Sequence, residues 1–251
     1  MESLNRLLSI MKRLRDPDTG CEWDRAQSFK SIAPYTIEEA YEVADAIDLG
    51  DMTELRGELG DLLLQVVFHA QMASEQGSFD FEAVATTIAD KMEARHPHIF
   101  GSEDGLMTGS RWEDIKQTER QKKGATSALD GVANALPALM RAEKLQKRAS
   151  RVGFDWPDIA GPRAKVLEEL SELEAAEHAQ QAEEAGDLLF AVANLVRAYG
   201  LSPETVLKKA NAKFERRFKS MENMADGNFH RLDIDQQEKL WDAVKSSEKA
   251  N

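Results

Sequence analysis

Pairs of acidic residues spaced three apart are the part of this 251-residue sequence best suited to chemistry. Residues three or four apart share one face of a helix, so Glu169 and Glu172 point together, and Glu184 and Asp187 do the same. The same spacing occurs once more, earlier in the chain, among Glu39, Glu42, Glu58 and Asp61. Each half of the chain therefore holds four carboxylates that helices can bring together.

Carboxylates gathered in this way predict a bound cation. Like charges held close together repel, so either their protonation changes or cations neutralise them. Sites made only of oxygen ligands select hard ions, and magnesium usually bridges carboxylates to substrate phosphates. An isolated Glu-x-x-Glu is more often a solvated helix face, but here the pattern occurs twice beside Gly-Asp-Leu-Leu. The sequence therefore predicts Mg²⁺ sites, with Mn²⁺ as a substitute.

The two halves of the chain repeat each other. Four short patterns of the first half recur in the same order in the second. They are Glu38–Glu42 with Glu168–Glu172, Glu58–Leu63 with Glu184–Leu189, Lys91–Arg95 with Lys213–Arg217, and Trp112 and Lys116 with Trp241 and Lys245. This order predicts two tandem copies of one unit, at residues 1–122 and 131–251, joined by a linker at 123–130 that is rich in small and polar residues.

Composition and end signals predict helices throughout. Gly and Pro are few, good helix formers are abundant, and Val and Ile form no alternating runs. Gly50 and Asp51 predict the end of one helix and the start of the next, and Ser202 followed by Pro203 predicts another start. Asp235 is expected to cap the last helix in a capping box. These signals predict an all-α protein that consists of two helical bundles.

Two of the expected helices are apolar on nearly every side. Six of the seven residues after Asp61 are apolar, as are eight of the nine after Asp187. A helix that is hydrophobic all round needs neighbours on all sides. We therefore expect pairing of subunits, or of the two units.

Charge and cysteine content limit the partners and the compartment. The net charge of −13 argues against nucleic acid or an anionic membrane surface as a partner. Cys21 is the only cysteine, which fits a reducing compartment, and no secretory signal opens the chain. The longest apolar run, Leu188–Val196, is too short to cross a bilayer. A cytoplasmic protein is expected.

Glu-Glu-x-x-Glu followed by Glu-x-x-Asp, with a basic helix behind it, resembles the MazG family of nucleoside triphosphate pyrophosphohydrolases in its two-unit form. Arg95–His98 and Asn211–Phe218 also resemble segments of that family. The resemblance covers nearly the whole chain. It implies a tandem repeat of a MazG-like bundle, a homodimer, and metal-dependent hydrolysis of ribo- or deoxynucleoside triphosphates to the monophosphate and pyrophosphate. Such an enzyme would cleanse the nucleotide pool.

The resemblance also implies roles for single residues. The magnesium ligands would be Glu169, Glu172, Glu184 and Asp187, with Glu39, Glu42, Glu58 and Asp61 as their counterparts in the first unit. Residues that would bind the substrate are Lys165, Lys213, Arg217, Trp241 and Lys245. Lys213 and Arg217 suit phosphate, although a plain basic surface is the alternative, and Trp241 either stacks on the base or packs in the core. Glu168 or Glu183 is expected to orient or deprotonate the attacking water.

Positive charge predicts which unit works. The second unit has Lys165 and a basic run from Lys208 to Arg217, whereas the first has mainly Lys91 and Arg95. A triphosphate needs more compensation than two cations offer. We therefore expect the second unit to be the main catalyst and the first to be weakly active or structural.

Two alternatives belong to other classes. Glu93 and His96 form a Glu-x-x-His motif, but a di-iron carboxylate bundle requires two such motifs. The other alternative is a non-catalytic scaffold that binds nucleotide with magnesium and releases no pyrophosphate.

Overall fold

The secondary structure of this protein is helical wherever it is described. The computed structural model describes residues 2–101, 106–122 and 124–250, and these contain no strand. The prediction of an all-α fold is confirmed. The chain divides into two compact units, Met1–Lys116 and Gln117–Asn251. The segment predicted as a linker, 123–130, starts at a residue outside the described part and falls within the second unit.

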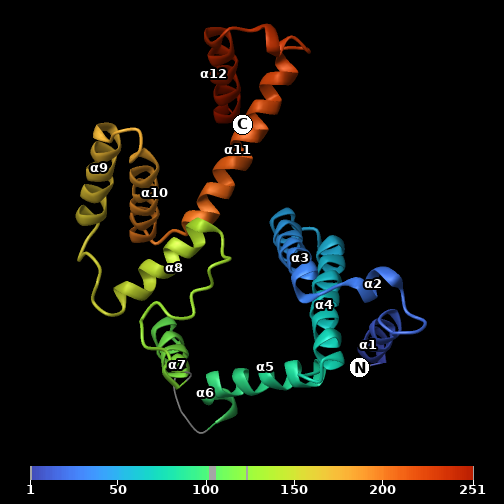
Figure 1. Cartoon of the computed structure of the whole chain (residues 1–251). Coiled ribbons are helices and arrows are strands. Elements are labelled where there is room, and N and C mark those ends of the chain that lie inside the picture. Colours follow the sequence, from blue (N-terminus) through green and yellow to red (C-terminus); the bar gives the residue numbers. More distant parts are fainter. Residues whose placement is uncertain (1, 102–105, 123, 251) are drawn as a thin grey trace. The chain divides into compact units, whose positions relative to one another are not determined.

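The first unit is built on a long helical hairpin (Figure 1). Its helices are α1 (Glu2–Leu14), α2 (Glu22–Ala26), α3 (Phe29–Leu49), α4 (Met52–Glu75), α5 (Phe81–Arg95), α6 (Pro97–Phe100) and the start of α7 (Gly109–Lys122). Helices α3 and α4 lie side by side because only Gly50 and Asp51 separate them. The buried core joins α1, α3 and α4 through Met11, Ile32, Val67, Phe68 and Met72.

The second unit contains a matching hairpin. Its helices are α8 (Ala138–Ser150), α9 (Ala160–Ala175), α10 (Gln181–Ala198), α11 (Pro203–Met224), the 3₁₀ turn η1 (Phe229–Arg231) and α12 (Ile234–Ala250). Helices α9 and α10 pack side by side, α8 packs against α10, and α12 folds back on α11 (Figure 1). The acidic pairs of the sequence thus sit on the hairpin α9–α10 here and on α3–α4 in the first unit.

The helix ends test the predicted signals directly. Gly50 has the left-handed φ of 72° and Asp51 accepts hydrogen bonds from the amides of Thr53 and Glu54, as expected. Ser202 is the N-cap residue of α11 and Pro203 its first residue, as predicted, but the Ser202 hydroxyl donates to Glu143 at 3.0 Å and makes no capping bond.

The prediction that Asp235 caps the last helix was wrong. The capping box at α12 uses Asp233, which exchanges hydrogen bonds with Gln236, and Asp235 lies inside the helix. A Gln or Glu follows three residues after each of Asp233 and Asp235, so the capping-box pattern alone does not choose between the two aspartates.

The repeat is visible in matching aromatic contacts. In the first unit the guanidinium of Arg95 lies 5.4 Å from the ring centre of Trp112. In the second unit Arg217 lies 5.4 Å from the ring centre of Trp241. A basic helix and a tryptophan helix therefore meet in the same way in both copies, as the recurring sequence patterns predict.

The apolar helices keep uncovered faces. Leu63 on α4 is 38% exposed, and Leu189 and Phe190 on α10 are 62% and 45% exposed. Part of the apolar surface that we expected to be covered is therefore exposed in the described part of each unit. Among the described helices, none combines the length and the apolar character that crossing a membrane requires.

Candidate functional site

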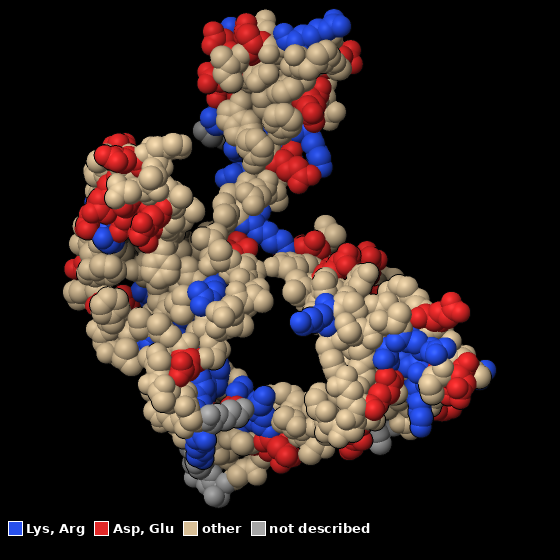
Figure 2. Space-filling view, in the orientation of Figure 1, with Lys and Arg blue, Asp and Glu red and all other residues tan. Residues whose placement is uncertain are grey.

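Helices α9 and α10 bring three acidic side chains of the second unit together. Glu169, Glu172 and Glu184 each offer one carboxylate oxygen, and these oxygens all lie within 4.8 Å of one another. Glu169 is buried, Glu184 is half-buried and Glu172 is exposed. Acidic side chains gather over this hairpin in Figure 2. Two helical faces that meet in a hairpin thus produce the cluster that the spacing predicts.

The charge of this cluster is only partly compensated by the chain. Lys165 lies one turn before Glu169 on α9, and its Nζ approaches Glu169 Oε1 at 2.6 Å and Glu168 Oε1 at 2.8 Å. These hydrogen bonds raise the pKa of Lys165. The pKa of Glu172 is raised, first by loss of hydration and then by the charge of Glu169. A bound cation would relieve this repulsion, so the donor set fits a hard divalent ion.

The remaining predicted acids lie beside this group. Asp187 is outside the three-residue cluster and lines a cavity together with Lys165 and Glu169. Glu168 is exposed and paired with Lys165, and Glu183 is exposed near the start of α10. Glu168 and Asp187 thus adjoin the cluster through Lys165 and the cavity, whereas no described contact ties Glu183 to it.

The cavity beside the cluster has a volume of about 600 Å³. Most of its wall is apolar and includes Phe154, Trp156 and Phe190, while Gln146 and Asn194 are buried polar members. Gly161 sets the position of the Trp156 ring, because a Cβ at this glycine would lie 2.0 Å from Trp156 Cδ1. The site therefore combines a carboxylate cluster with an adjoining apolar chamber.

A partly exposed polar network lines this cavity. Arg197 donates to both carboxylate oxygens of Asp155, at 2.8 and 2.9 Å, and to Asn194 Oδ1 at 2.9 Å. The bonds from Arg197 lower the pKa of Asp155. Sequence reasoning missed these residues. The available signals were Asn194, the one polar residue within an apolar run, and the acidic residue before Trp156.

The predicted phosphate-binding residues lie on the hairpin of α11 and α12. Arg217 forms an ion pair with Glu248, at 2.7 Å, and stacks over Trp241, whereas Lys213 is exposed. Lys245 pairs with Asp242 at 3.1 Å. No contact given for the described residues joins these side chains to the acidic cluster, so their role in binding substrate stays a prediction.

The first unit has an acidic cluster of the same size. Glu39, Glu58 and Asp61 offer oxygens within 4.8 Å of one another, and Glu42 lies outside the group. Loss of hydration, followed by the charge of Asp61, raises the pKa of Glu39. Gln65 donates to Glu39 at 3.3 Å. Tyr35 stands four residues before Glu39, where the second unit has Lys165 before Glu169, so the first unit has no lysine at the position equivalent to Lys165.

The histidine motif does not join either cluster. Among the described residues, both groups with metal-binding geometry consist of carboxylates alone. The Nδ1 atom of His96 lies 2.6 Å from the carbonyl oxygen of Met92, one turn earlier on its own helix. The ring also packs against Trp112. This arrangement disfavours the di-iron alternative.

Comparison with known proteins agrees with this arrangement. Residues 27–100 match the MazG nucleotide pyrophosphohydrolase domain, and residues 143–214 match phosphoribosyl-ATP pyrophosphohydrolase. The chain is 49% identical to the nucleoside triphosphate pyrophosphohydrolase of Escherichia coli strain K12, over 99% of each chain. It is 44% identical to the nucleoside triphosphate pyrophosphohydrolase/pyrophosphatase MazG of Thermotoga maritima, over 96% of this chain and 95% of that protein.

A third relative covers part of the chain. The nucleoside triphosphate pyrophosphohydrolase of Mycobacterium tuberculosis is 36% identical over 61% of this chain and 46% of its own length. The two domain matches cover both acidic hairpins, and the full-length matches span the complete pair of units. This chain therefore belongs to the MazG family of nucleotide pyrophosphohydrolases.

Proposed function

We propose that this chain hydrolyses nucleoside triphosphates to the monophosphate and pyrophosphate at the acidic cluster of its second unit, with Mg²⁺ as cofactor. The observation that carries the proposal is the convergence of Glu169, Glu172 and Glu184 beside an apolar cavity. The names of the full-length relatives support the same reaction.

The metal would be held by the three converging carboxylates, with Asp187 at the edge of the cavity as a fourth ligand. When bound, Mg²⁺ or its substitute Mn²⁺ supplies charge neutralisation and a more acidic water. Loss of hydration and the charge of Glu169 raise the pKa of Glu172, and a cation bound beside it would favour its ionised form. The oxygen-only donor set favours a hard ion over zinc or iron.

The cavity is suited to the nucleoside part of the substrate. Its volume of about 600 Å³ lies within the range of roughly 300–1,000 Å³ that is typical of small-molecule sites. Phe154, Trp156 and Phe190 offer ring faces on which a base can stack. A wall that is mostly apolar holds bases of several kinds, which fits a role in cleansing the nucleotide pool.

The chain's own side chains would place the attacking water and the phosphates. Glu168 and Glu183 are the two nearby acids that the proposed ligand set leaves unused, so either one would orient or deprotonate the water. Lys165 already touches the cluster and would neutralise charge at the phosphate nearest to it. Lys213 and Arg217, with Trp241 and Lys245, would bind the outer phosphates or cover the base.

A homodimer would complete this site. The exposed apolar faces of α4 and α10, with Leu189 at 62% and Phe190 at 45% exposure, are surfaces that a second subunit would bury. Arg216 and Arg217 of α11 pair with Glu248 of α12 and not with the acidic cluster. A second chain is a natural source of the missing phosphate contacts. We further propose a cytoplasmic location.

The first experiment tests the ligand role of the cluster. Purified wild-type chain and the variant Glu172→Gln are compared for pyrophosphate release from a panel of ribo- and deoxynucleoside triphosphates, with and without Mg²⁺. We expect turnover to fall by more than about 100-fold, because one cation ligand is lost while the shape is kept. Circular dichroism checks the fold. Unchanged turnover in the variant would remove the cluster from the reaction.

The second experiment decides which unit works. Asp187→Asn is expected to lower turnover strongly, and Asp61→Asn to lower it by less than twofold, because Lys165 has no counterpart beside Glu39. Equal losses would contradict the assignment to the second unit. If wild-type protein binds nucleotide with Mg²⁺ yet releases no pyrophosphate, the chain is the non-catalytic scaffold of the alternative hypothesis.

A further inference from the structure

A second pocket of the second unit has a chemistry unlike that of the acidic site. It lies where the end of α7, the segment 125–128 and the end of α8 meet, and its volume is about 210 Å³. Three arginines line it: Arg120, Arg148 and Arg151. None of the described lining residues is acidic. The pocket shares no lining residue with the 600 Å³ cavity.

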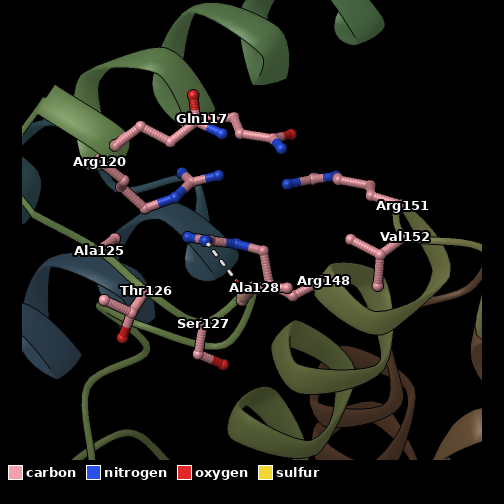
Figure 3. Close-up of a pocket in the computed structure, with 10 residues that line it drawn as sticks. Gln117, Arg120, Ala125, Thr126, Ser127, Ala128, Arg148, Arg151 and Val152 are labelled. Carbon is pink, nitrogen blue, oxygen red and sulfur yellow. Dashed lines mark hydrogen bonds between the residues drawn. The ribbon is translucent and has the colours of Figure 1, made fainter.

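The three arginines point toward one another across this pocket (Figure 3). Arg120 reaches in from α7, and Arg148 and Arg151 from the last turn and C-cap of α8. Cations at a helix C-terminus are favoured by the helix dipole, which accounts for the two arginines of α8. The dipole of α8 does not account for Arg120, which comes from α7 and adds a third positive charge to the pocket. A convergence of guanidinium groups from two helices is typical of anion binding.

The other polar groups of the pocket also suit an anion. Gln117 and Gln121 have amide donors, and Thr126 and Ser127 have hydroxyls. Arg148 donates to the carbonyl oxygen of Ala128 at 3.4 Å, which ties the segment to α8. The lining of the pocket thus contains several polar side chains besides the three arginines.

The size of the pocket selects a compact ligand. A volume of about 210 Å³ is below the roughly 300 Å³ at which sites for whole drug-sized ligands begin. We propose that Arg120, Arg148 and Arg151 form a metal-independent site for a compact phosphate-type oxyanion, of the size of phosphate or pyrophosphate. The planar fork of each arginine matches the oxygens of such an ion. The site is separate from the acidic clusters and needs no turnover.

Calorimetric titration with inorganic pyrophosphate tests this site. The full chain is freed of metal with a chelator, so that the carboxylate clusters cannot bind the anion through a cation. We expect binding by the wild type. Arg120→Gln and Arg151→Gln should each weaken it by about tenfold or more, the effect of one lost charge-assisted hydrogen bond. The affinity should fall steeply as salt is raised.

Two control variants separate this pocket from other basic surfaces. Arg231→Gln removes an exposed arginine of the same unit, and Lys213→Gln removes a predicted phosphate-binding residue of α11. Arg231→Gln should bind pyrophosphate within about twofold of the wild type, whereas a loss in Lys213→Gln alone would place the anion on α11 and not in this pocket. Arg120→Lys keeps the positive charge but lacks the planar guanidinium, so it should lose part of the affinity for pyrophosphate. Because this variant is expected to fold and to bind weakly, it distinguishes loss of the site from loss of the fold.

The proposal is overturned if the metal-free wild type does not bind pyrophosphate, or if Lys213→Gln abolishes binding while Arg120→Gln does not. Loss of thermal stability in Arg151→Gln with unchanged affinity would likewise reduce these arginines to a structural role. Because the titration contains neither metal nor nucleotide, its outcome is independent of the proposed hydrolysis.

Discussion

Replacing Gly161 by alanine tests whether the apolar cavity binds the nucleoside. A Cβ at this position would lie 2.0 Å from Cδ1 and 2.2 Å from Cγ of Trp156, whereas ordinary contacts are 3.4–4 Å. The indole must therefore move by at least about 1.4 Å, the difference between 3.4 and 2.0 Å. Cγ is the root of the ring, so a swing of the tip alone cannot relieve the clash. One wall of the cavity has to be rebuilt.

The kinetic result expected is a rise in KM with little change in kcat. Stacking of the base contributes equally to the ground state and the transition state, so its loss weakens binding without slowing the chemical step. Since a misplacement of about 1 Å can cost up to about 100-fold, we expect KM for nucleoside triphosphates to rise by about tenfold. Steady-state pyrophosphate release gives KM, and tryptophan emission reports the displacement of the indole.

The matched control is Gly57→Ala, a glycine inside α4 whose added Cβ would meet nothing within 4 Å. Both changes replace a helical glycine and raise helix propensity alike. Only Gly161→Ala is expected to alter emission and KM. If tryptophan emission changes while KM stays at the wild-type value, the base does not occupy this cavity. An unchanged emission spectrum would refute the steric reasoning itself.

Three further outcomes concern stability. Partial loss of hydration and the neighbouring charge of Glu169 raise the pKa of Glu172, so its ionisation destabilises the fold as pH rises through that raised pKa. Glu172→Gln should therefore raise the Tm of metal-free protein at about pH 7, and the gain should vanish below about pH 4 or with Mg²⁺. Arg15→Gln removes a side chain that is 9% exposed and bonded to Glu75. Urea unfolding should show a decrease of about 2–3 kcal/mol in the free energy of unfolding, which is less than the roughly 3–5 kcal/mol typical of breaking a fully buried ion pair. This pair lowers the pKa of Glu75, so its contribution is present above the ordinary pKa and should be lost as pH falls. Met11→Ala, in the core at 1% exposure, should cost about 2–5 kcal/mol in the same assay, and a loss below about 1 kcal/mol would contradict the packing described.

The helical hairpins and the acidic clusters follow from short-range patterns in the sequence. Helical spacing places Glu169 and Glu172 on one face, and Glu184 joins them because α9 and α10 pack side by side. The glycine and aspartate at 50 and 51 end one helix and begin the next for reasons that involve only neighbouring residues. Such features depend on contacts within a few residues, so one sequence suffices to predict them.

Features that depend on distant partners were not predictable. Asp155 and Arg197 lie 42 residues apart, and their bond exists because the segment before α9 meets the end of α10. Ser202 looked like a cap, but the nearby buried carboxylate of Glu143 competes successfully for its hydroxyl. Asp187 shares a helix with Glu184, yet it lines the cavity and stays outside the three-residue cluster, whereas its counterpart Asp61 joins the cluster of the first unit. Spacing says which face a residue occupies, and tertiary packing decides what it contacts.

The bond between Ser202 and Glu143 has a mechanical consequence. It fixes the start of α11 to α8, and Lys147 holds the same carboxylate at 2.5 Å. Helix α11 has 22 residues and is therefore about 33 Å long, so a tilt of about 5° at its base would carry its far end through about 3 Å. Small changes around the buried carboxylate of Glu143 would therefore produce larger displacements at the far end of α11, the helix whose basic side chains are predicted to bind phosphate.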